Sequence, residues 1–279
     1  MKVGFIGLGS MGLPMAQRIR SAGHDLTVYA RRKASLEPFA DTGGAAATAA
    51  VTIAATPAAM GLAVEAVGIC VFDAAGVEEV MFGPDGLADA LRPGTVVLVH
   101  STVSPPQIRE IAGRAAEHGL RVLDAPVSGG APRASTGELT IMVGGDGEAL
   151  AEVADLLAAL SNHVVHLGGI GAGSHAKLIN NTMFSAQIAL ADDAMRAGQS
   201  LGLDPAGLVA VLLTSSSACV ASGVRLRADS SAALAGSQAA VTLAKDVELM
   251  ASVLGDAPGS ELVAVARRFV TALQHDDHG

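Results

Sequence analysis

Aromatic residues are scarce in this sequence, at 3% of the chain with no tryptophan and one tyrosine. Proteins that bind single-stranded nucleic acid stack the bases on aromatic rings, which this chain largely lacks. The formal net charge of −9 also opposes binding to phosphate backbones and to anionic membranes. We therefore expect a small-molecule partner, and neither a nucleic acid nor a membrane.

Cysteine is also scarce, with only Cys70 and Cys219 in the chain. Two isolated cysteines make neither a disulfide framework nor a zinc site, and no histidine has the helical spacing of a zinc ligand. The N-terminus lacks the long apolar region of a secretory signal, and no run of about 18 apolar residues stands out as a membrane span. We therefore expect a cytoplasmic protein without a bound metal.

What the sequence does have is a change of pattern past its middle. At 279 residues, half of them hydrophobic, the chain can bury a large core. Its first part alternates short apolar runs with helical patterns, which is typical of a parallel sheet covered by helices. From residue 174 onward the pattern is helical. We therefore predict an α/β protein with a Rossmann-type, doubly wound domain over residues 1–167 and an all-α domain over residues 168–279.

The individual elements follow from the same patterns. The predicted strands cover residues 3–6, 26–30, 67–72, 95–100, 120–124, 139–145 and 164–166. The predicted helices cover residues 13–19, 87–91, 104–118, 147–160, 174–201, 205–214, 239–253 and 260–273. The alanine-rich stretch 43–67 should hold a short helix, a strand and turns.

The first strand runs directly into a glycine motif that opens the first helix. The motif consists of Gly7, Leu8, Gly9, Ser10, Met11 and Gly12. In this context the first glycine makes a tight turn, the second lets the backbone approach a pyrophosphate, and the third lets the helix pack on the strand. The motif predicts a dinucleotide site.

The end of the second strand indicates which dinucleotide binds. An acidic residue there would hold the ribose hydroxyls, but the sequence has Ala30 followed by Arg31 and Arg32. A guanidinium suits a 2′-phosphate by charge and geometry, so we expect NADP in preference to NAD, with NAD still possible. The alternative is an exposed basic loop without a role.

The segment from Gly171 to Asn181 is the candidate for the chemistry. We expect Ser174 to cap a helix and Lys177 to lie in its first turn. Asn181, four residues on, projects from the same face, so that both side chains could address one carbonyl oxygen. The alternative is a solvated lysine and asparagine on a surface helix.

Four motifs in one order carry a resemblance to a known family. They are Gly7–Gly12, the segment from Asp124 to Gly130, the segment from Gly171 to Asn181, and Lys245-Asp246. Over nearly its whole length the chain resembles the β-hydroxyacid dehydrogenases, which include 3-hydroxyisobutyrate dehydrogenase and the tartronate and succinic semialdehyde reductases. The resemblance implies a homodimer or a homotetramer.

The resemblance also assigns roles to individual residues. It implies that Lys177 is catalytic with Asn181 beside it. It implies that a loop grips the carboxylate of the substrate, and backbone amides could form such a nest; its residues are Ser128, Gly129 and Gly130. Further contacts to the cofactor are implied for Phe72, Thr102 and Lys245.

Three positions depart from the family pattern. Phe72-Asp73 stands where the family often has Leu-Pro, Asp192-Asp193 where it usually has a glutamate, and Ala239-Ala240 where it has an aromatic residue. These departures leave the substrate side of the site less defined than the cofactor side.

We therefore expect reversible hydride transfer between NADP(H) and a small β-hydroxy acid or its semialdehyde, with Lys177 as general acid and base. One alternative is an enzyme of the same fold that resembles the imine reductases, although these usually carry another residue at the position of Lys177. The other is a cofactor-binding protein without catalytic activity.

Overall fold

The computed structural model describes residues 1–40 and 49–274 of the chain. Residues 41–48, at the start of the alanine-rich stretch, therefore lie outside the described residues. The chain falls into two compact units, Met1–Lys177 and Leu178–Gly279. A Rossmann-like sheet domain and a helical C-terminal region are present, which confirms the predicted fold class.

The first unit is built on a sheet of six parallel strands in the order β3-β2-β1-β4-β5-β6. The strands are β1 (Lys2–Ile6), β2 (Asp25–Tyr29), β3 (Val51–Ile53), β4 (Ala66–Ile69), β5 (Val96–Val99) and β6 (Arg121–Asp124). Because all six run in one direction, their carboxyl ends meet at one edge of the sheet. Strands β1 and β4 are neighbours at the point where the strand order reverses, which is where such sheets bind ligands.

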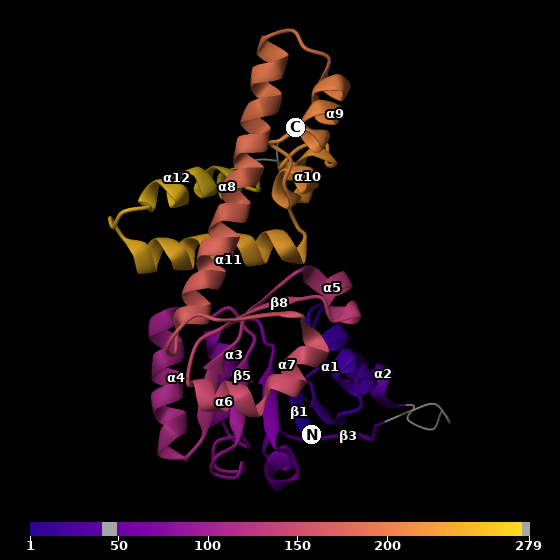
Figure 1. The fold of residues 1–279 in the computed structure, drawn as a ribbon, viewed down its shortest axis with the longest axis vertical. Coiled ribbons are helices and arrows are strands. Elements are labelled where there is room, and N and C mark those ends of the chain that lie inside the picture. Colours follow the sequence, from indigo (N-terminus) through magenta and orange to yellow (C-terminus); the bar gives the residue numbers. More distant parts are fainter. Residues whose placement is uncertain (41–48, 275–279) are drawn as a thin grey trace. The chain divides into compact units, whose positions relative to one another are not determined.

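Helices cover both faces of this sheet (Figure 1). Phe5 and Leu98 face a core shared with α1 and α7, whereas Ile6 and Val97 face a core shared with α3 and α4. Successive residues of a strand point to opposite faces, which explains why these strands are apolar throughout. The helices and turns of this unit are α1 (Gly12–Ser21), η1 (Lys33–Leu36), α2 (Glu37–Ala40), η2 (Ala58–Ala63), α3 (Ala74–Phe82), α4 (Pro105–Glu117), α5 (Gly130–Thr136), α6 (Gly147–Glu152) and α7 (Ala154–Leu160).

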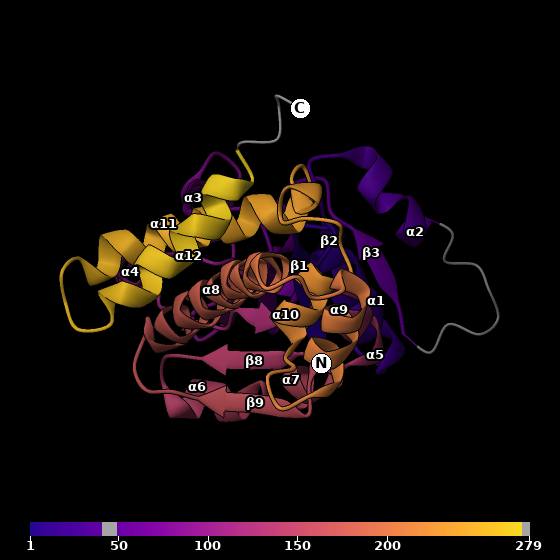
Figure 2. The ribbon, with the colours of Figure 1, turned by 90° about the horizontal axis from the view of Figure 1, so that it is seen from above.

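A second sheet of three strands follows β6. It contains β7 (Val127–Ser128), β8 (Thr140–Val143) and β9 (His163–His166), and Figure 2 shows β8 and β9 side by side. Asp124, at the end of β6, pairs with Gly144 just after β8. The two sheets are therefore joined at the residue with which β6 ends.

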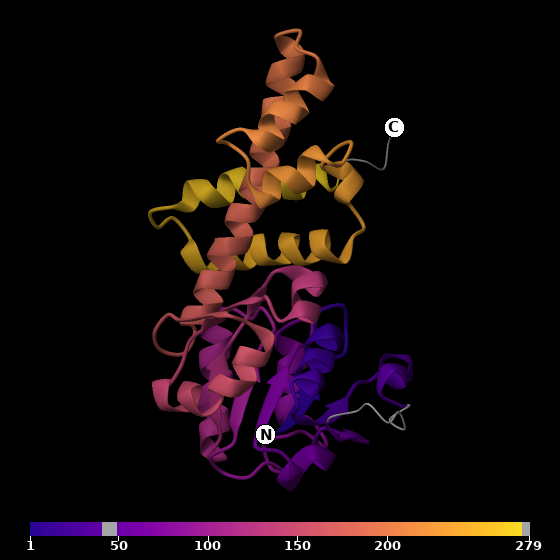
Figure 3. The same cartoon turned by 45° about the vertical axis from the view of Figure 1, so that its right-hand side comes forward.

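The second unit is helical. Its helices α11 and α12 run side by side as a hairpin (Figure 3), and they enclose a core with Leu178 and Ala186 of α8. No helix in the described parts of the chain is long and apolar enough to cross a membrane. The helices are α8 (Ala172–Ser200), which starts in the first unit, α9 (Pro205–Thr214), α10 (Val220–Leu226), η3 (Ala232–Leu234), α11 (Gln238–Leu254) and α12 (Ser260–Ala272).

Two predicted helices need correction, and several short helices were not predicted. The helix expected over residues 87–91 is a series of turns, and its leucines are buried in the core rather than on a helix face. The helix expected over residues 147–160 is interrupted at Val153, which separates α6 from α7. The sequence patterns also missed α3, α5 and α10, which are all nine residues or shorter.

Candidate active site

The predicted cofactor residues of the first unit gather at the carboxyl edge of the six-stranded sheet. The glycine motif follows β1, Arg31 and Arg32 follow β2, Phe72 follows β4, and Thr102 follows β5. These four strands are consecutive neighbours in the order β2-β1-β4-β5. The fold therefore brings together segments that lie far apart in the sequence, and it does so at the switch point between β1 and β4.

The glycine motif makes a cradle that side chains would fill. Gly7 has a positive φ of 94°, and a Cβ there would lie 2.3 Å from the carbonyl oxygen of Cys70. A Cβ at Gly12 would lie 1.8 Å from the carbonyl oxygen of Gly7, whereas a Cβ at Gly9 would meet no atom within 4 Å. The outer two positions therefore need glycine for packing, and the space above Gly9 fits a pyrophosphate at the start of α1.

The loop that carries Phe72 is held from both sides. The hydroxyl of Ser101, two residues beyond the end of β5, accepts a hydrogen bond of 2.9 Å from the amide of Val71. The carboxylate of Asp73 accepts a bond of the same length from the amide of Gly76 and caps α3. Phe72 itself is 51% exposed between these two anchors. The departure Phe72-Asp73 thus has a local role, because the aspartate is a helix cap.

Arg31 has an acidic neighbour that the sequence did not indicate. Its Nη1 lies 3.6 Å from Oε2 of Glu79 on α3. Both side chains are largely exposed, and Arg32 is exposed as well. Solvent screens such a pair strongly, so Arg31 can exchange Glu79 for another anion at little cost.

Two titratable groups at the same edge of the sheet are held neutral. Burial lowers the pKa of His100 to about 4, although its bond of 2.8 Å to the carbonyl oxygen of Ala125 acts in the opposite direction. Burial raises the pKa of Cys70 to about 12. Neither group supplies a charge or a thiolate nucleophile at neutral pH. Among the described residues, no cluster of histidine, cysteine or acidic side chains could hold a metal ion.

The predicted carboxylate loop lies where a strand passes into a helix. Ser128 ends β7 and pairs with Thr140 of β8, Gly129 precedes α5, and Gly130 is the first residue of that helix. Ser128 is partly exposed and both glycines are exposed. The junction between β7 and α5 is therefore at the surface of the first unit.

The start of α8 differs from the prediction. The helix begins at Ala172, so Ser174 lies inside its first turn and Lys177 lies in the second turn, where it is partly exposed. The hydroxyl of Ser174 is buried and has no hydrogen-bond partner among the described residues. Asp124 takes the place expected for Ser174, because its carboxylate accepts hydrogen bonds from the amides of Gly171 (2.8 Å) and Ser174 (2.6 Å).

Asn181 is oriented by a buried aspartate of the second unit. Its Nδ2 donates to Oδ2 of Asp246 on α11 over 2.6 Å, and its Oδ1 accepts from Nδ2 of Asn180 over 3.1 Å. A carboxylate only accepts, so this bond fixes which end of the amide faces Asp246. Nζ of Lys245 lies 3.2 Å from the other oxygen of Asp246. Nδ2 of Asn181 carries a second hydrogen, for which the described residues provide no recorded acceptor.

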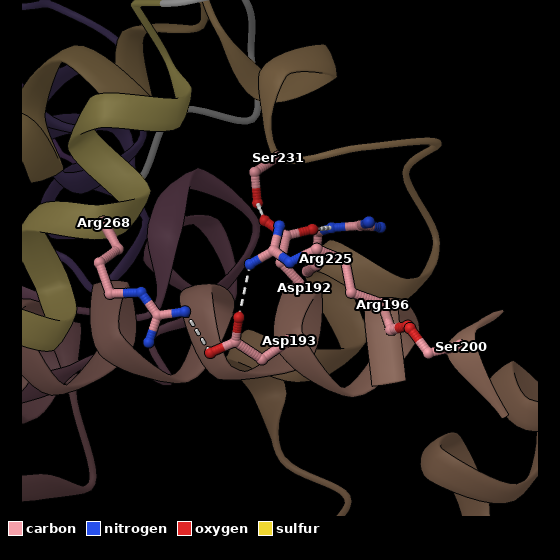
Figure 4. Close-up of polar contacts among 7 residues, drawn as sticks. All are labelled: Asp192, Asp193, Arg196, Ser200, Arg225, Ser231 and Arg268. Carbon is pink, nitrogen blue, oxygen red and sulfur yellow. Dashed lines mark hydrogen bonds and ion pairs between the residues drawn. The ribbon is translucent and has the colours of Figure 1, made fainter. Parts of the chain in front are cut away.

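Asp192 and Asp193, in the middle of α8, serve different networks (Figure 4). Asp192 is buried and accepts from Nε of Arg225 and from the hydroxyl of Ser231. Asp193 pairs near the surface with Arg196 and Arg268. Both carboxylates are therefore engaged in interactions that hold the helical unit together.

Two family models match the chain. The NAD-binding domain of 6-phosphogluconate dehydrogenase matches residues 2–168, and the NAD-binding domain of NADP-dependent 3-hydroxyisobutyrate dehydrogenase matches residues 171–279. Together they cover nearly the whole sequence, and they change over just before α8.

Individual proteins show the same similarity. L-threonate dehydrogenase of Cupriavidus necator is 41% identical over 75% of this chain and 69% of that protein. The crystal structure of 3-hydroxyisobutyrate dehydrogenase from Salmonella typhimurium has a TM-score of 0.82 at 28% identity, over 97% of this chain and 93% of that one. The Mycobacterium tuberculosis 3-hydroxyisobutyrate dehydrogenase with L-serine has a TM-score of 0.80 at 28% identity, over 97% and 94% of the two chains.

Proposed function

Because this chain belongs to the β-hydroxyacid dehydrogenase family and is an NAD(P)-dependent oxidoreductase, we propose that it interconverts a small β-hydroxy acid and its semialdehyde. In this proposal NADP(H) is the preferred cofactor, and Lys177 is the general acid and base. One observation carries the proposal. The first turn of the helix that bears Lys177 is bonded to Asp124, at the same sheet edge as the glycine cradle.

We place the cofactor in the domain of residues 1–167, on the backbone from Gly7 to Gly12. Phe72 and Thr102 lie at the ends of the neighbouring strands and are proposed to contact it, as is Lys245. Arg31 and Arg32 would take the 2′-phosphate, because guanidinium groups bind phosphate in a bidentate way. The NADP dependence named in the description of the second matching family supports this choice.

For the chemistry, Lys177 is proposed to give a proton to the carbonyl oxygen during reduction and to take the hydroxyl proton during oxidation. When it is bound, NADPH supplies the hydride that reaches the carbonyl carbon. Asn181 would donate its remaining Nδ2 hydrogen to the same oxygen, since it lies one helical turn beyond Lys177.

The substrate carboxylate is proposed to bind Ser128 and the backbone of Gly129 and Gly130. The exposure of this strand-to-helix junction supports the assignment. L-serine, present with the Mycobacterium tuberculosis relative, is a β-hydroxy acid. We therefore place the substrate of this chain among short acids with a hydroxyl or aldehyde one carbon beyond the carbon next to the carboxylate.

The test is a screen of the purified protein by NADPH absorbance. The panel contains succinic, tartronic and methylmalonic semialdehydes, glyoxylate and cyclic imines. With the best substrate, Lys177→Ala should lower kcat by roughly 10²- to 10⁴-fold, the usual contribution of general acid–base catalysis. His175→Ala is the matched control, because His175 is an exposed side chain on the same helix. A near-normal kcat in Lys177→Ala would refute the assigned role.

We also propose that the protein is a homodimer or homotetramer. On α8 of the second unit, Ile179, Met183 and Leu190 are 50%, 47% and 52% exposed. Their spacing puts these apolar side chains on one helix face, which supports burial against another subunit. Light scattering coupled to size exclusion measures the mass directly, and a monomer across the micromolar range would contradict this proposal.

A further inference from the structure

Asp124 makes an unusual set of contacts at the end of β6. Its carboxylate accepts from two amides at the start of α8, those of Gly171 and Ser174. Its own amide donates to the carbonyl oxygen of Gly144 over 3.1 Å, and the amide of Gly144 donates back over 2.9 Å. One residue thus connects the six-stranded sheet, the three-stranded sheet and the first turn of α8.

The position is built for a carboxylate. Asp124 is 1% exposed, and a buried charge is costly unless hydrogen bonds and opposite charge compensate for it. Here two amides donate to it, and the positive end of a 29-residue helix faces it. The described part of the chain offers these two amides no other side-chain acceptor. Asp124 is therefore the group that fixes the start of α8.

The packing around Asp124 leaves α8 little freedom to move. A Cβ on Gly144 would lie 2.4 Å from Oδ1 of Asp124, so the carboxylate occupies space that only glycine leaves open. A Cβ on Gly173, in the first turn of α8, would lie 2.3 Å from the carbonyl oxygen of Met142 and 2.9 Å from that of Asp124. The helix backbone is thus in direct contact with the strand ends.

We propose that Asp124 is a positioning residue for the reaction, which holds the helix of Lys177 in register with the loop of Ser128. Asp124 precedes Ser128 by four residues through Ala125 and Pro126, and its carboxylate reaches the turn before Lys177. The groups proposed to bind the substrate and to move the proton are thereby tied to one side chain. This inference rests on the function proposed above for Lys177.

Asp124→Asn tests the proposal with almost no change in volume. An amide can accept from one of the two backbone N–H groups but presents its own N–H groups to the other. We expect kcat to fall at least 10-fold, while the dissociation constant of the better-bound nicotinamide cofactor stays within twofold. Asp124→Ala, which keeps no acceptor, should fall further. Rates are expressed per cofactor-binding site, titrated by the fluorescence of the reduced cofactor, so that unfolded molecules do not count.

Ser174→Ala is the matched control, because it removes the unpartnered hydroxyl and keeps the amide that Asp124 uses. It should retain kcat within twofold. Lys177→Ala is measured in parallel. If Lys177→Ala loses activity and Asp124→Asn keeps a normal kcat per site, the positioning role is wrong and the proposed function stands. If Asp124→Asn loses cofactor binding together with activity, Asp124 is needed only for folding, and the proposal is overturned. A near-normal Lys177→Ala would refute the function itself.

Discussion

Replacing Glu79 with glutamine should raise the preference of the protein for NADPH over NADH. Arg31 is proposed to bind the 2′-phosphate that distinguishes the two cofactors, and its Nη1 lies 3.6 Å from Oε2 of Glu79. That carboxylate competes with the phosphate for Arg31 and repels it through its own charge. Neutralising Glu79 removes both effects, and neither effect acts on NADH.

The expected magnitude follows from the distance and the exposure. Two unit charges at this separation interact in water by about 1 kcal/mol, and exposed ion pairs measure roughly 0.2–1 kcal/mol. The side chains of Arg31 and Glu79 are 77% and 63% exposed, so the lower part of that range applies. Since about 1.4 kcal/mol corresponds to tenfold, the ratio of kcat/KM for NADPH to that for NADH should rise roughly 1.5- to 2.5-fold. Arg31→Ala should lower the ratio by about 10-fold or more, because hydrogen bonds to charged groups contribute about 1.5–3 kcal/mol.

Initial rates with both cofactors at low and moderate salt provide the assay. Glu78→Gln is a matched control, because Glu78 is the preceding residue on α3, carries the same charge and pairs with Arg114 instead. It should leave the ratio unchanged, and raising the salt concentration should reduce the effect of Glu79→Gln. If Glu79→Gln lowers the ratio, or Arg31→Ala affects both cofactors equally, Arg31 does not bind the 2′-phosphate.

Two further predictions concern stability. Burial lowers the pKa of His100 from its ordinary value of 6.5 to about 4 in the folded chain. The neutral imidazole therefore contributes fully to the free energy of unfolding above pH 6.5, and this contribution is lost as the pH falls toward 4. Between pH 7 and pH 5 this loss amounts to about 2 kcal/mol. Urea unfolding at the two pH values should therefore show a larger decrease in the free energy of unfolding for the native chain than for His100→Asn. Equal decreases would contradict the lowered pKa of His100. Asp192→Asn leaves buried Arg225 without its ion pair and should lower the free energy of unfolding by about 3 kcal/mol, whereas Asp193→Asn should cost less than about 1 kcal/mol. Equal losses in these two variants would mean that the buried network is not the stronger one.

The sequence predicted the parts of the fold that depend on long or repeated patterns. Continuous apolar runs identified β1, β4 and β5, because strands covered on both faces have no polar side. The periodicity of α8 and α11 located both helices to within two residues. Predictions of short elements were wrong or missing, because a few residues carry too little of any pattern. Leu87 and Leu91 have helical spacing, but they are buried in turns whose shape the surrounding core determines.

The candidate site was predictable only where its residues form a local motif. The spacing of the glycines directly after a strand predicts the turn and the start of the helix, so the residues of the glycine motif could be named from the sequence alone. Glu79 beside Arg31 is an acidic residue without any local pattern, and the motif that contains Asp246 does not indicate its contact with Asn181. Their partners lie far away along the chain, and only the tertiary fold brings each pair together.

The start of α8 shows how a local pattern can identify an element and still give the wrong cap. Ser174 has the right residue type for a cap, but the helix begins before it and leaves its hydroxyl buried without a partner among the described residues. Asp124, some 50 residues earlier, fills the role because the sheet ends beside the helix. A nearby serine could have capped α8 without reference to any other segment. An aspartate on β6 makes the position of Lys177 depend on the sheet edge that is proposed to bind the cofactor and leads into the loop of Ser128, so the cap couples the groups that a transfer reaction must align.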